Sequence, residues 1–352
     1  MQISTFTIVS VVLIIHFIRL SMIKAHIVLF FLLIGLSCRN IEAQKELVIA
    51  FGSCNHQWEE QPIWDKIDAQ HPDIWIWLGD IIYADTESMI KMKSDYDLQT
   101  SNDEYQDFIT DKIVYGTWDD HDYGANNSGK DYAQKDSSKM LLLDFLDVPS
   151  DNLVHTRPGV YQSYQQSLGE HLIKIILLDV RYFRDDPGSE NTIIGDEQWA
   201  WFENELQNSK ADIHIIGGGS QFLPEDHRFE KWANYPSDRK RLLDLLDKYE
   251  VNLPLLISGD RHLAEMSLVP TDGGIPVLEV TSSGLTHSYR GFTQETNRHR
   301  VGGDVVSSKN FGVIKLSSST NVQYEVGLYN EEGQLEYSLN SGQLRAKLER
   351  KN

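Results

Sequence analysis

The sequence predicts an α/β fold, most simply two packed β-sheets covered by helices, with a strand-rich carboxyl-terminal end. Through most of the chain, short apolar runs of strand length alternate with amphipathic segments of helix length. From residue 277 onward, strand-like runs follow one another with only short turns between them. No fixed-period repeat and no Pro- or Ser-rich linker divides the chain. We therefore expect residues 44–352 to form a single domain.

The composition limits the classes of partner. The chain has 352 residues, 41% of them hydrophobic, which is enough for a sizeable core. Its 32 Lys and Arg against 52 Asp and Glu give a net charge of −20. Such a charge disfavours nucleic acid or an anionic membrane surface as a standing partner, and it favours metal cations.

Residues 1–43 are predicted to be a targeting region. An apolar run at 27–36 follows Lys24 and is followed by small and polar residues up to Ala43. A second apolar run lies at 8–18, and Met22 is an alternative start of the protein. We expect export with cleavage near Ala43, and hence an extracytoplasmic (periplasmic or secreted) protein. Contact with a membrane is expected only if this region is retained as an anchor or lipidated at Cys38.

In the amino-terminal half, apolar runs end at polar or ionisable residues. Strands are predicted at 46–51, at the start of 73–83 and at 113–118, with helices at 61–71, 103–112 and 134–146. The first strand runs into Gly52-Ser53-Cys54-Asn55, and the third into Asp119-Asp120-His121-Asp122. A carboxylate directly after a buried strand, such as Asp80, is costly to bury unless something positive compensates it.

The carboxyl-terminal half continues this pattern and then changes. An antiparallel pair is predicted at 161–166 and 172–178, around a turn at Gly169-Glu170. Helices are expected after Asp196, as N-cap, and from Ser237, with strands at 213–216 and 253–257. The final strands are predicted at 277–281, 311–316, 322–328 and 335–339.

Six predicted strand ends offer a set of side chains rich in the carboxylate, imidazole, thiolate, phenol and amide groups that suit metals: Cys54; Asp80 with Tyr83; Asp119 to Asp122 with Asn126; Asp179 with Arg181; Gln221; and Asp260 with His262. Each has an ordinary structural explanation when taken alone. Cys54 suits a small buried position, Asp80 a turn cap, the 119–122 segment a solvated turn, and Asp179 with Arg181 an ion pair. Together they favour a metal centre. The mixture of soft and hard ligands predicts two metals of different character.

Five segments also carry a family resemblance: 51–55, 77–83, 117–124, 178–183 and 258–262, with the sequences FGSCN, WLGDIIY, TWDDHDYG, LDVRYF and SGDRH. In this order they resemble the PhoD-type alkaline phosphatases of the calcineurin-like metallophosphoesterase superfamily. The resemblance covers roughly residues 47–285. It implies a four-layer αββα sandwich, with two mixed sheets flanked by helices and a metal cluster at the strand ends. It also implies hydrolysis of a small phosphoester substrate, either a monoester or a diester.

The resemblance further implies which residues hold the metals. An Fe³⁺ ion would be bound by Cys54, Asp80, Tyr83 and Asp260. Neighbouring divalent ions would be bound by Asp80, Asn126 and His262, with Asp80 as the bridge. Ca²⁺ is the family expectation for these ions, and Mg²⁺ or Mn²⁺ are alternatives at the second site.

A mechanism follows from such a cluster. The cations would lower the pKa of a bound water, so that hydroxide attacks the phosphate in line. We expect Arg181 to stabilise the equatorial oxygens, and His121 and Asp120 to protonate the leaving group or orient the water. Trp58, Trp232 and the loop 286–300 are expected at the pocket wall. The alternative is a calcium-stabilised extracytoplasmic binding protein without hydrolase activity, in which the acidic loops only brace the fold.

Overall fold

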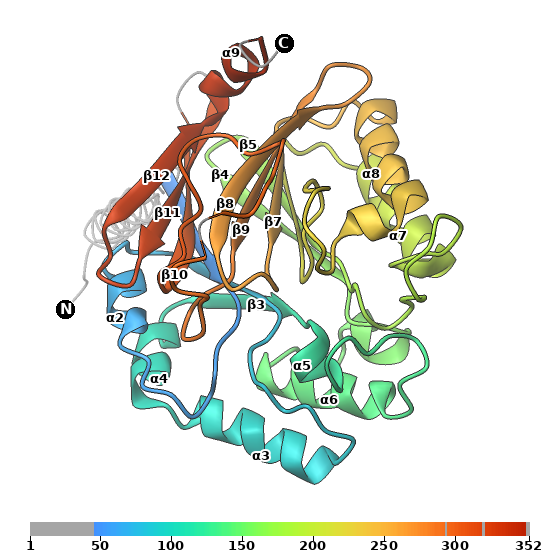
Figure 1. Cartoon of the computed structure of the whole chain (residues 1–352), viewed down its shortest axis with the longest axis vertical. Coiled ribbons are helices and arrows are strands. Elements are labelled where there is room, and N and C mark those ends of the chain that lie inside the picture. The colour runs from blue at the N-terminus through green and yellow to red at the C-terminus, as the bar shows by residue number, and fades with distance from the viewer. Residues whose placement is uncertain (1–45, 293, 319–320, 350–352) are drawn as a thin grey trace, which may run out of the picture. The chain divides into compact units, whose positions relative to one another are not determined.

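Strands from both halves of the chain form the two sheets of the computed structural model, which describes residues 46–292, 294–318 and 321–349 (Figure 1). The predicted targeting region, 1–43, lies outside the described residues. None of the described helices is long and apolar enough to cross a membrane.

The first sheet has six strands in the order β12-β11-β10-β1-β2-β3. Their bounds are β1 Glu46–Gly52, β2 Ile74–Leu78, β3 Ile113–Thr117, β10 Asn310–Ser318, β11 Val322–Asn330 and β12 Leu335–Asn340. β1, β2 and β3 run parallel, whereas β10 pairs with β1 antiparallel and continues into an antiparallel meander.

The second sheet also has six strands, in the order β4-β5-β6-β7-β9-β8. Their bounds are β4 Gln162–Leu168, β5 His171–Leu177, β6 Ile213–Gly218, β7 Pro254–Ser258, β8 Ala264–Pro270 and β9 Pro276–Ser282. β5, β6, β7 and β9 run parallel, and antiparallel β4 and β8 close the two edges. In parallel strands all carboxyl ends meet at one edge, which gathers the side chains that follow them.

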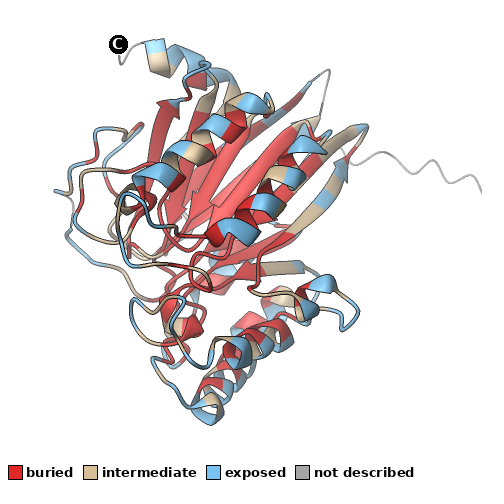
Figure 2. Cartoon of the chain, turned by 90° about the vertical axis from the view of Figure 1, so that its right-hand side faces the viewer, coloured by how far each residue is buried: buried red, intermediate tan, exposed pale blue. Residues whose placement is uncertain are grey.

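Helices cover the outer face of each sheet. Against the first sheet pack α2 Ile63–Asp68, α3 Met89–Thr100, α4 Asp103–Ile109 and α6 Lys135–Phe145. Against the second pack α7 Gly195–Gln207 and α8 Pro236–Lys248, which Figure 2 shows with their buried sides toward the strands. The short helices are α5 Asp120–Tyr123, α9 Leu344–Glu349 and three 3₁₀ turns, η1 Leu153–Thr156, η2 Trp232–Asn234 and η3 Ser341–Gln343. The predicted four-layer αββα sandwich is confirmed.

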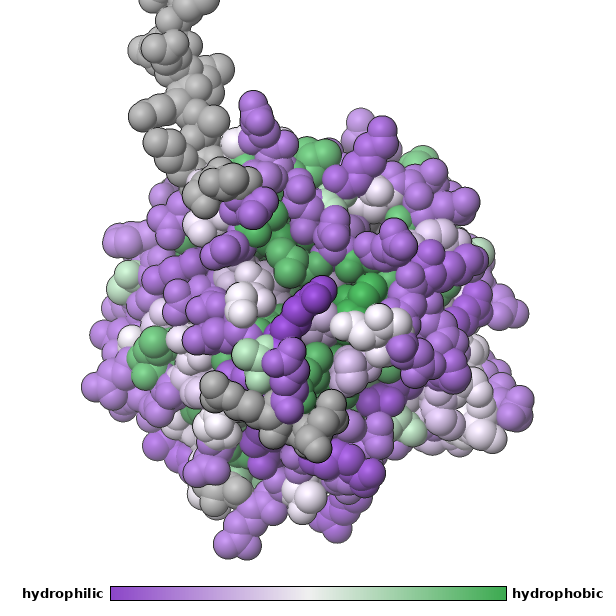
Figure 3. All heavy atoms as spheres, turned by 90° about the horizontal axis from the view of Figure 1, so that it is seen from above, coloured by the Kyte–Doolittle hydropathy of each residue, from purple (hydrophilic) through white to green (hydrophobic). Residues whose placement is uncertain are grey.

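Strand β2 shows how the sequence produces these layers. Its side chains alternate, so that Ile74, Ile76 and Leu78 enter the core between the sheets while Trp75 and Trp77 face the helices. Both faces are buried, which explains why the strand is apolar throughout rather than alternating with polar residues. The surface at the end of the sheets opposite α5, seen in Figure 3, is mostly hydrophilic, unlike the buried faces of β2.

Several local predictions were wrong. The helix expected at 61–71 is only α2, Ile63–Asp68, and Asp196 lies in the first turn of α7, whose N-cap is Ile194. Helix α3 and strand β8 were not predicted. The antiparallel pair around Gly169-Glu170 is confirmed as β4 and β5.

Candidate functional site

Four candidate ligands follow their strands at the same spacing along the sequence. Cys54, Asp80, Asp119 and Asp260 each lie two residues beyond the last residue of β1, β2, β3 and β7. Three of them have a left-handed backbone, with φ of 60° at Cys54, 49° at Asp80 and 69° at Asp260, as does His262 at 55°. Backbone conformations of this kind cost about 1–3 kcal/mol each and gather at functional sites. The turns direct these side chains into one space.

Two glycines allow the strand ends to approach closely. Gly79 has φ of 84°, and a Cβ built there would lie 2.4 Å from Asp119 Cβ. At Gly219, after β6, a Cβ would lie 2.5 Å from Asp119 Cγ. A side chain at either position would displace Asp119 from the site.

The carboxylates form two overlapping groups. One ligand atom each of Asp80, Asp120 and His121 lies within 4.8 Å of the others, and the same holds for Asp119, Asp120 and Asp260. The Asp80 Oδ2 atom accepts hydrogen bonds from Cys54 Sγ and Tyr83 Oη, both at 3.4 Å. Asp80 therefore contacts two of the other candidate ligands, and its role as a bridge between ions stays a prediction.

Three carboxylate oxygens in this group are buried without a hydrogen-bond partner among the described residues: Asp80 Oδ1, Asp119 Oδ2 and Asp120 Oδ1. Burial raises the pKa of Asp80, and it raises that of Asp260 to about 7 and that of the Cys54 thiol to about 12. Unpaired buried acceptors are costly, and a cation supplies the missing partner. The donor set thus fits bound metal ions.

His121 and Asp120 face this group from α5, which lies just below the strands in Figure 1. Burial opposes a charge on His121, but the hydrogen bond to Asp85, 2.8 Å from Nδ1, and the charges of Asp80 and Asp120 raise its pKa to about 10. Burial likewise disfavours ionised Asp120, yet Arg181 and His121 bring its pKa below the ordinary value. The site therefore pairs a protonated imidazole with an ionised carboxylate.

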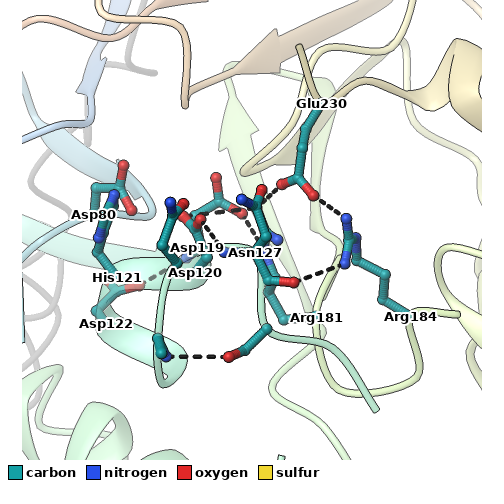
Figure 4. Close-up of polar contacts among 12 residues, drawn as sticks. Asp80, Asp119, Asp120, His121, Asp122, Asn127, Arg181, Arg184 and Glu230 are labelled. Carbon is teal, nitrogen blue, oxygen red and sulfur yellow. Dashed lines mark hydrogen bonds and ion pairs between the residues drawn. The ribbon is translucent and has the colours of Figure 1, made fainter. Parts of the chain in front are cut away.

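Arg181 is fully buried, and Figure 4 shows it between the two carboxylates of Asp119 and Asp120 and the side chain of Glu230. Its Nε donates to Asp119 Oδ1 at 2.5 Å, and its Nη2 donates to Glu230 Oε2 at 2.6 Å. Glu230 also pairs with Arg184, which donates to the backbone oxygen of Asn127. Arg181 is not among the residues that line the cavity. This placement favours a positioning role over direct contact with a phosphate.

A cavity of about 440 Å³ is lined by two of these carboxylates, Asp120 and Asp260, whereas Asp80 and Asp119 lie outside its lining. Asn126 lines it, and its backbone N–H donates to Asp85 Oδ1 at 3.1 Å. His262 lines it as well, with Nδ1 3.2 Å from the backbone oxygen of His287. Its other lining residues are His56, Tyr83, His121, Asn127, Phe229, Glu230, Arg261, His287 and Tyr289.

The structure changes the predicted pocket wall. Trp232 is fully buried in the core under α7 and α8 and does not line the cavity. Trp58 is exposed and stacks on His56, with ring centroids 4.8 Å apart. Two lining residues, Phe229 and Glu230, escaped prediction because they lie in irregular loop without a motif. Arg261 also lines the cavity, but no role was predicted for its side chain, although it lies between the predicted ligands Asp260 and His262 in the sequence.

Two other strand-end candidates are structural. The Asp179 carboxylate accepts hydrogen bonds from Trp118 Nε1 at 2.7 Å and from three backbone N–H groups, and it makes no side-chain ion pair with Arg181. The ion pair considered for these two residues is therefore wrong. Gln221 donates to Glu265 and to Thr281 Oγ1.

Comparison with known proteins supports this picture. A sequence model of the family described as PhoD-like phosphatase matches residues 48–348. The chain belongs to the PhoD-like phosphatase family. The resemblance inferred from the five motifs is thereby confirmed, and the family supports the predicted enzyme class, a hydrolase of phosphoric ester bonds.

Individual relatives are distant. Alkaline phosphatase D of Bacillus subtilis (strain 168) is 23% identical over 198 residues, which cover 44% of this chain and 32% of that protein. The match therefore spans about a third of that relative. A solved structure described as PhoD superposes with a TM-score of 0.68 at 15% identity, over 84% of this chain and 72% of its own. A purple acid phosphatase from yellow lupin (Lupinus luteus) seeds gives 0.58 at 17% identity, over 84% and 54%. These structures show the shared fold.

Proposed function

We propose that this chain is a metal-dependent phosphoesterase that hydrolyses phosphate monoesters, diesters or both. The observation that carries the proposal is the convergence of three buried carboxylate oxygens that accept no hydrogen bond from the described residues, from Asp80, Asp119 and Asp120, at one group of strand ends. Membership of the family supports the reaction class. The neighbouring cavity, lined by polar and aromatic side chains, offers room for a small phosphoester.

The donor types suggest which ions are bound. Cys54, Asp80, Tyr83 and Asp260 would hold Fe³⁺, because a thiolate and a phenolate suit a trivalent transition ion. Asp80, Asn126 and His262 would contribute to a second site for Ca²⁺, with Mg²⁺ or Mn²⁺ as alternatives. When bound, such ions lower the pKa of a water and neutralise the phosphate oxygens.

The chain itself supplies proton transfer and orientation. His121 keeps its proton because its pKa is raised to about 10, and Asp85 fixes its ring through Nδ1. We assign to it the protonation of the leaving alkoxide. Asp120 stays ionised, since Arg181 and His121 outweigh its burial and lower its pKa, and one of its oxygens accepts from Asn127 N at 2.7 Å. It orients the attacking water. Arg181 positions Asp119 and, through Glu230, the neighbouring loop.

We also propose that the protein acts outside the cytoplasm after removal of residues up to Ala43. The apolar run at 27–36 and the small residues after it support export. Cys54 would then be the one cysteine left, and ligation of a metal would give that thiol a role in an oxidising compartment.

The test is elemental analysis of the purified protein beside hydrolysis of 4-nitrophenyl phosphate and bis(4-nitrophenyl) phosphate. We expect bound iron and phosphoester hydrolysis that chelation removes and metal restores. Cys54→Ala and Tyr83→Phe should lose iron and activity together. If folded, metal-loaded protein hydrolyses neither ester while metal removal only lowers its melting temperature, the calcium-stabilised binding protein is the correct description.

A further inference from the structure

Arg261 lies between Asp260 and His262 in the sequence, but its side chain makes different contacts. Its Nη2 donates to both carboxylate oxygens of Glu295, at 2.5 and 2.7 Å. Its guanidinium lies over the Phe229 ring, 4.3 Å from the centroid. Phe229 and Glu295 belong to the loops before η2 and before β10, so loops and not strand ends surround this charge. Arg261 nevertheless lines the same cavity as the candidate metal ligands.

The guanidinium of Arg261 is incompletely paired. The residue is only 2% exposed, and its Nε is buried without a hydrogen-bond partner among the described residues. A charged donor that is buried and unpaired costs more free energy than a neutral one. Because Arg261 lines the cavity, a ligand there is in position to supply an acceptor.

A second buried cation reinforces Arg261. Lys231 is 6% exposed, and its Nζ donates to the backbone oxygen of Phe229 at 3.2 Å and to Asn234 Oδ1 at 2.9 Å. Both of these acceptors are neutral. Burial, together with the charge of Arg261, lowers the pKa of Lys231, so the two cations lie close enough to repel each other.

Neighbouring groups cancel only part of this positive charge, because Glu295 pairs with Arg261 but not with Lys231. Burial, Arg261 and Lys231 lower the pKa of His227 to about 3, so its imidazole is neutral, and its Nε2 is buried without a partner among the described residues. Asp226 is bound by Arg298, whose Nε donates to it at 2.8 Å. Glu295 is the acid in direct contact with Arg261. We call the group Arg261, Lys231 and His227, covered by Phe229, the cationic pocket; Arg261 and Phe229 line the cavity, and Lys231 and His227 lie behind them and act through their charge and polarity.

We infer that the cationic pocket binds an anionic group of the substrate other than the phosphoryl group that is hydrolysed, namely a carboxylate or a second phosphate. This inference rests on the proposed phosphoesterase function. A planar guanidinium suits either oxyanion, because it presents parallel N–H donors to it. The chain as a whole carries a net charge of −20, which repels polyanions, so a positive group beside the proposed metal site favours the binding of a second anionic group.

The test measures binding and does not depend on turnover. Calorimetry would compare 4-carboxybenzylphosphonate with its uncharged carboxylate methyl ester on the metal-loaded protein, and p-xylylenediphosphonate would represent a second phosphate. We expect the wild-type protein to bind the better of the two anionic ligands about tenfold more tightly than the methyl ester. Arg261→Gln should bring this ratio close to one. Arg261→Lys, which keeps the charge but not the planar geometry, should retain part of it.

Matched variants separate this role from general effects. Arg241→Gln is the control, because Arg241 also lies over an aromatic ring, 4.6 Å from the centroid of Trp199, but lies on α8 outside the cavity. It should leave the ratio unchanged, whereas Lys231→Met should reduce it less than Arg261→Gln does. Metal content should be equal in all variants.

Two results would overturn the inference. The first is a wild-type protein without preference for either anionic ligand. The second is an Arg261→Gln variant that weakens the charged and uncharged ligands equally, which would assign Arg261 to the hydrolysed phosphoryl group. If the ratio behaves as expected but no ester is hydrolysed, the proposed function fails while the anion-binding pocket stands.

Discussion

Two sets of buried carboxylates occur in this protein, and they differ in how their oxygens are paired. The first set, which we call the ligand acids, leaves oxygens without partners; its members are Asp80, Asp119 and Asp120. The second set, the braced acids, has protein donors for its oxygens; its members are Asp179, Glu265 and Glu279. All six are almost completely buried.

The braced acids show what a structural carboxylate requires. Glu279 Oε1 accepts from Phe222 N and from Ser258 Oγ, at 2.9 and 2.6 Å, and its Oε2 accepts from Leu223 N at 2.7 Å. Glu265 accepts from Gln221 and from Arg300. These contacts tie loops to strands β8 and β9. Burial is therefore shared by both sets, and Asp179 also shares the position just beyond a strand, so that only the oxygens without a hydrogen bond mark a site for a cation.

The largest effect is expected from Asp80→Asn. The variant removes the proposed bridge between ions, whose Lewis-acid contribution amounts to several kcal/mol. We expect kcat for 4-nitrophenyl phosphate to fall by about 10³-fold or more, with loss of bound metal by elemental analysis. Asp179→Asn is the matched control, which should reduce stability but leave the metal content of the folded protein unchanged. Equal metal loss in both variants would break the distinction between the two sets.

A smaller effect is expected from a braced acid. Glu279→Ala would leave two backbone N–H groups and the Ser258 hydroxyl without their acceptor. Each unpaired buried group costs about 1–3 kcal/mol, so we expect the free energy of unfolding in urea to fall by about 3 kcal/mol. Metal content and the KM of the folded enzyme should not change. A variant as stable as the wild type would show that these contacts do not brace the loop.

The pH dependence of stability sharpens the comparison further. Burial raises the pKa of Glu279 from 4.5 to about 7, so the folded state holds this proton more tightly than the unfolded state. Its contribution is complete below the unfolded pKa and is lost as the pH rises through about 7. In buffer with a chelator, the free energy of unfolding of the wild-type protein should therefore fall relative to that of Glu279→Gln as the pH rises from the unfolded pKa of 4.5 through about 7, by about 3 kcal/mol. The free energies come from urea titrations at several pH values, and a pH dependence that is the same for the two proteins would contradict this role of Glu279.

The smallest effect is expected at an exposed pair. Lys93 and Asp97 on α3 form an ion pair of 2.6 Å with both side chains more than half exposed. Lys93→Ala should leave the melting temperature and the metal content unchanged within error, because solvent screens such pairs. A measurable loss of stability would mean that exposure does not separate surface charges from the two buried sets.

Much of the fold follows from local pattern. The apolar runs that correspond to β1, β2, β3 and β7 each end at polar residues, and this pattern predicted that Cys54, Asp80 and Asp260 lie at neighbouring strand ends. Helix α3 was not predicted, because only Met92, Tyr96 and Gln99 are buried in twelve largely polar residues. Strand β8 was missed because Glu265 and Ser267 are polar yet buried, through partners remote in sequence.

The sequence does not separate the ligand acids from the braced acids, and this limits prediction of the site. Asp80 and Asp179 have the same relation to their strands, and nothing local shows that Asp179 receives Trp118 Nε1 and three backbone N–H groups. Arg181 was expected to contact the substrate, and nothing local shows that Glu230, 49 residues away, accepts a hydrogen bond from its guanidinium. Long-range donors decide whether a strand-end residue binds a ligand or braces the fold.

The left-handed turn at Cys54 has a consequence for laboratory evolution. With φ of 60° in a buried position, this residue occupies a backbone conformation that glycine adopts without strain. Selection for thermal stability in metal-free medium would therefore reward Cys54→Gly, although that change deletes a proposed iron ligand. A library screened only for heat resistance would therefore accumulate variants that have lost iron binding and activity. Supplying iron during selection would reverse the preference at this position.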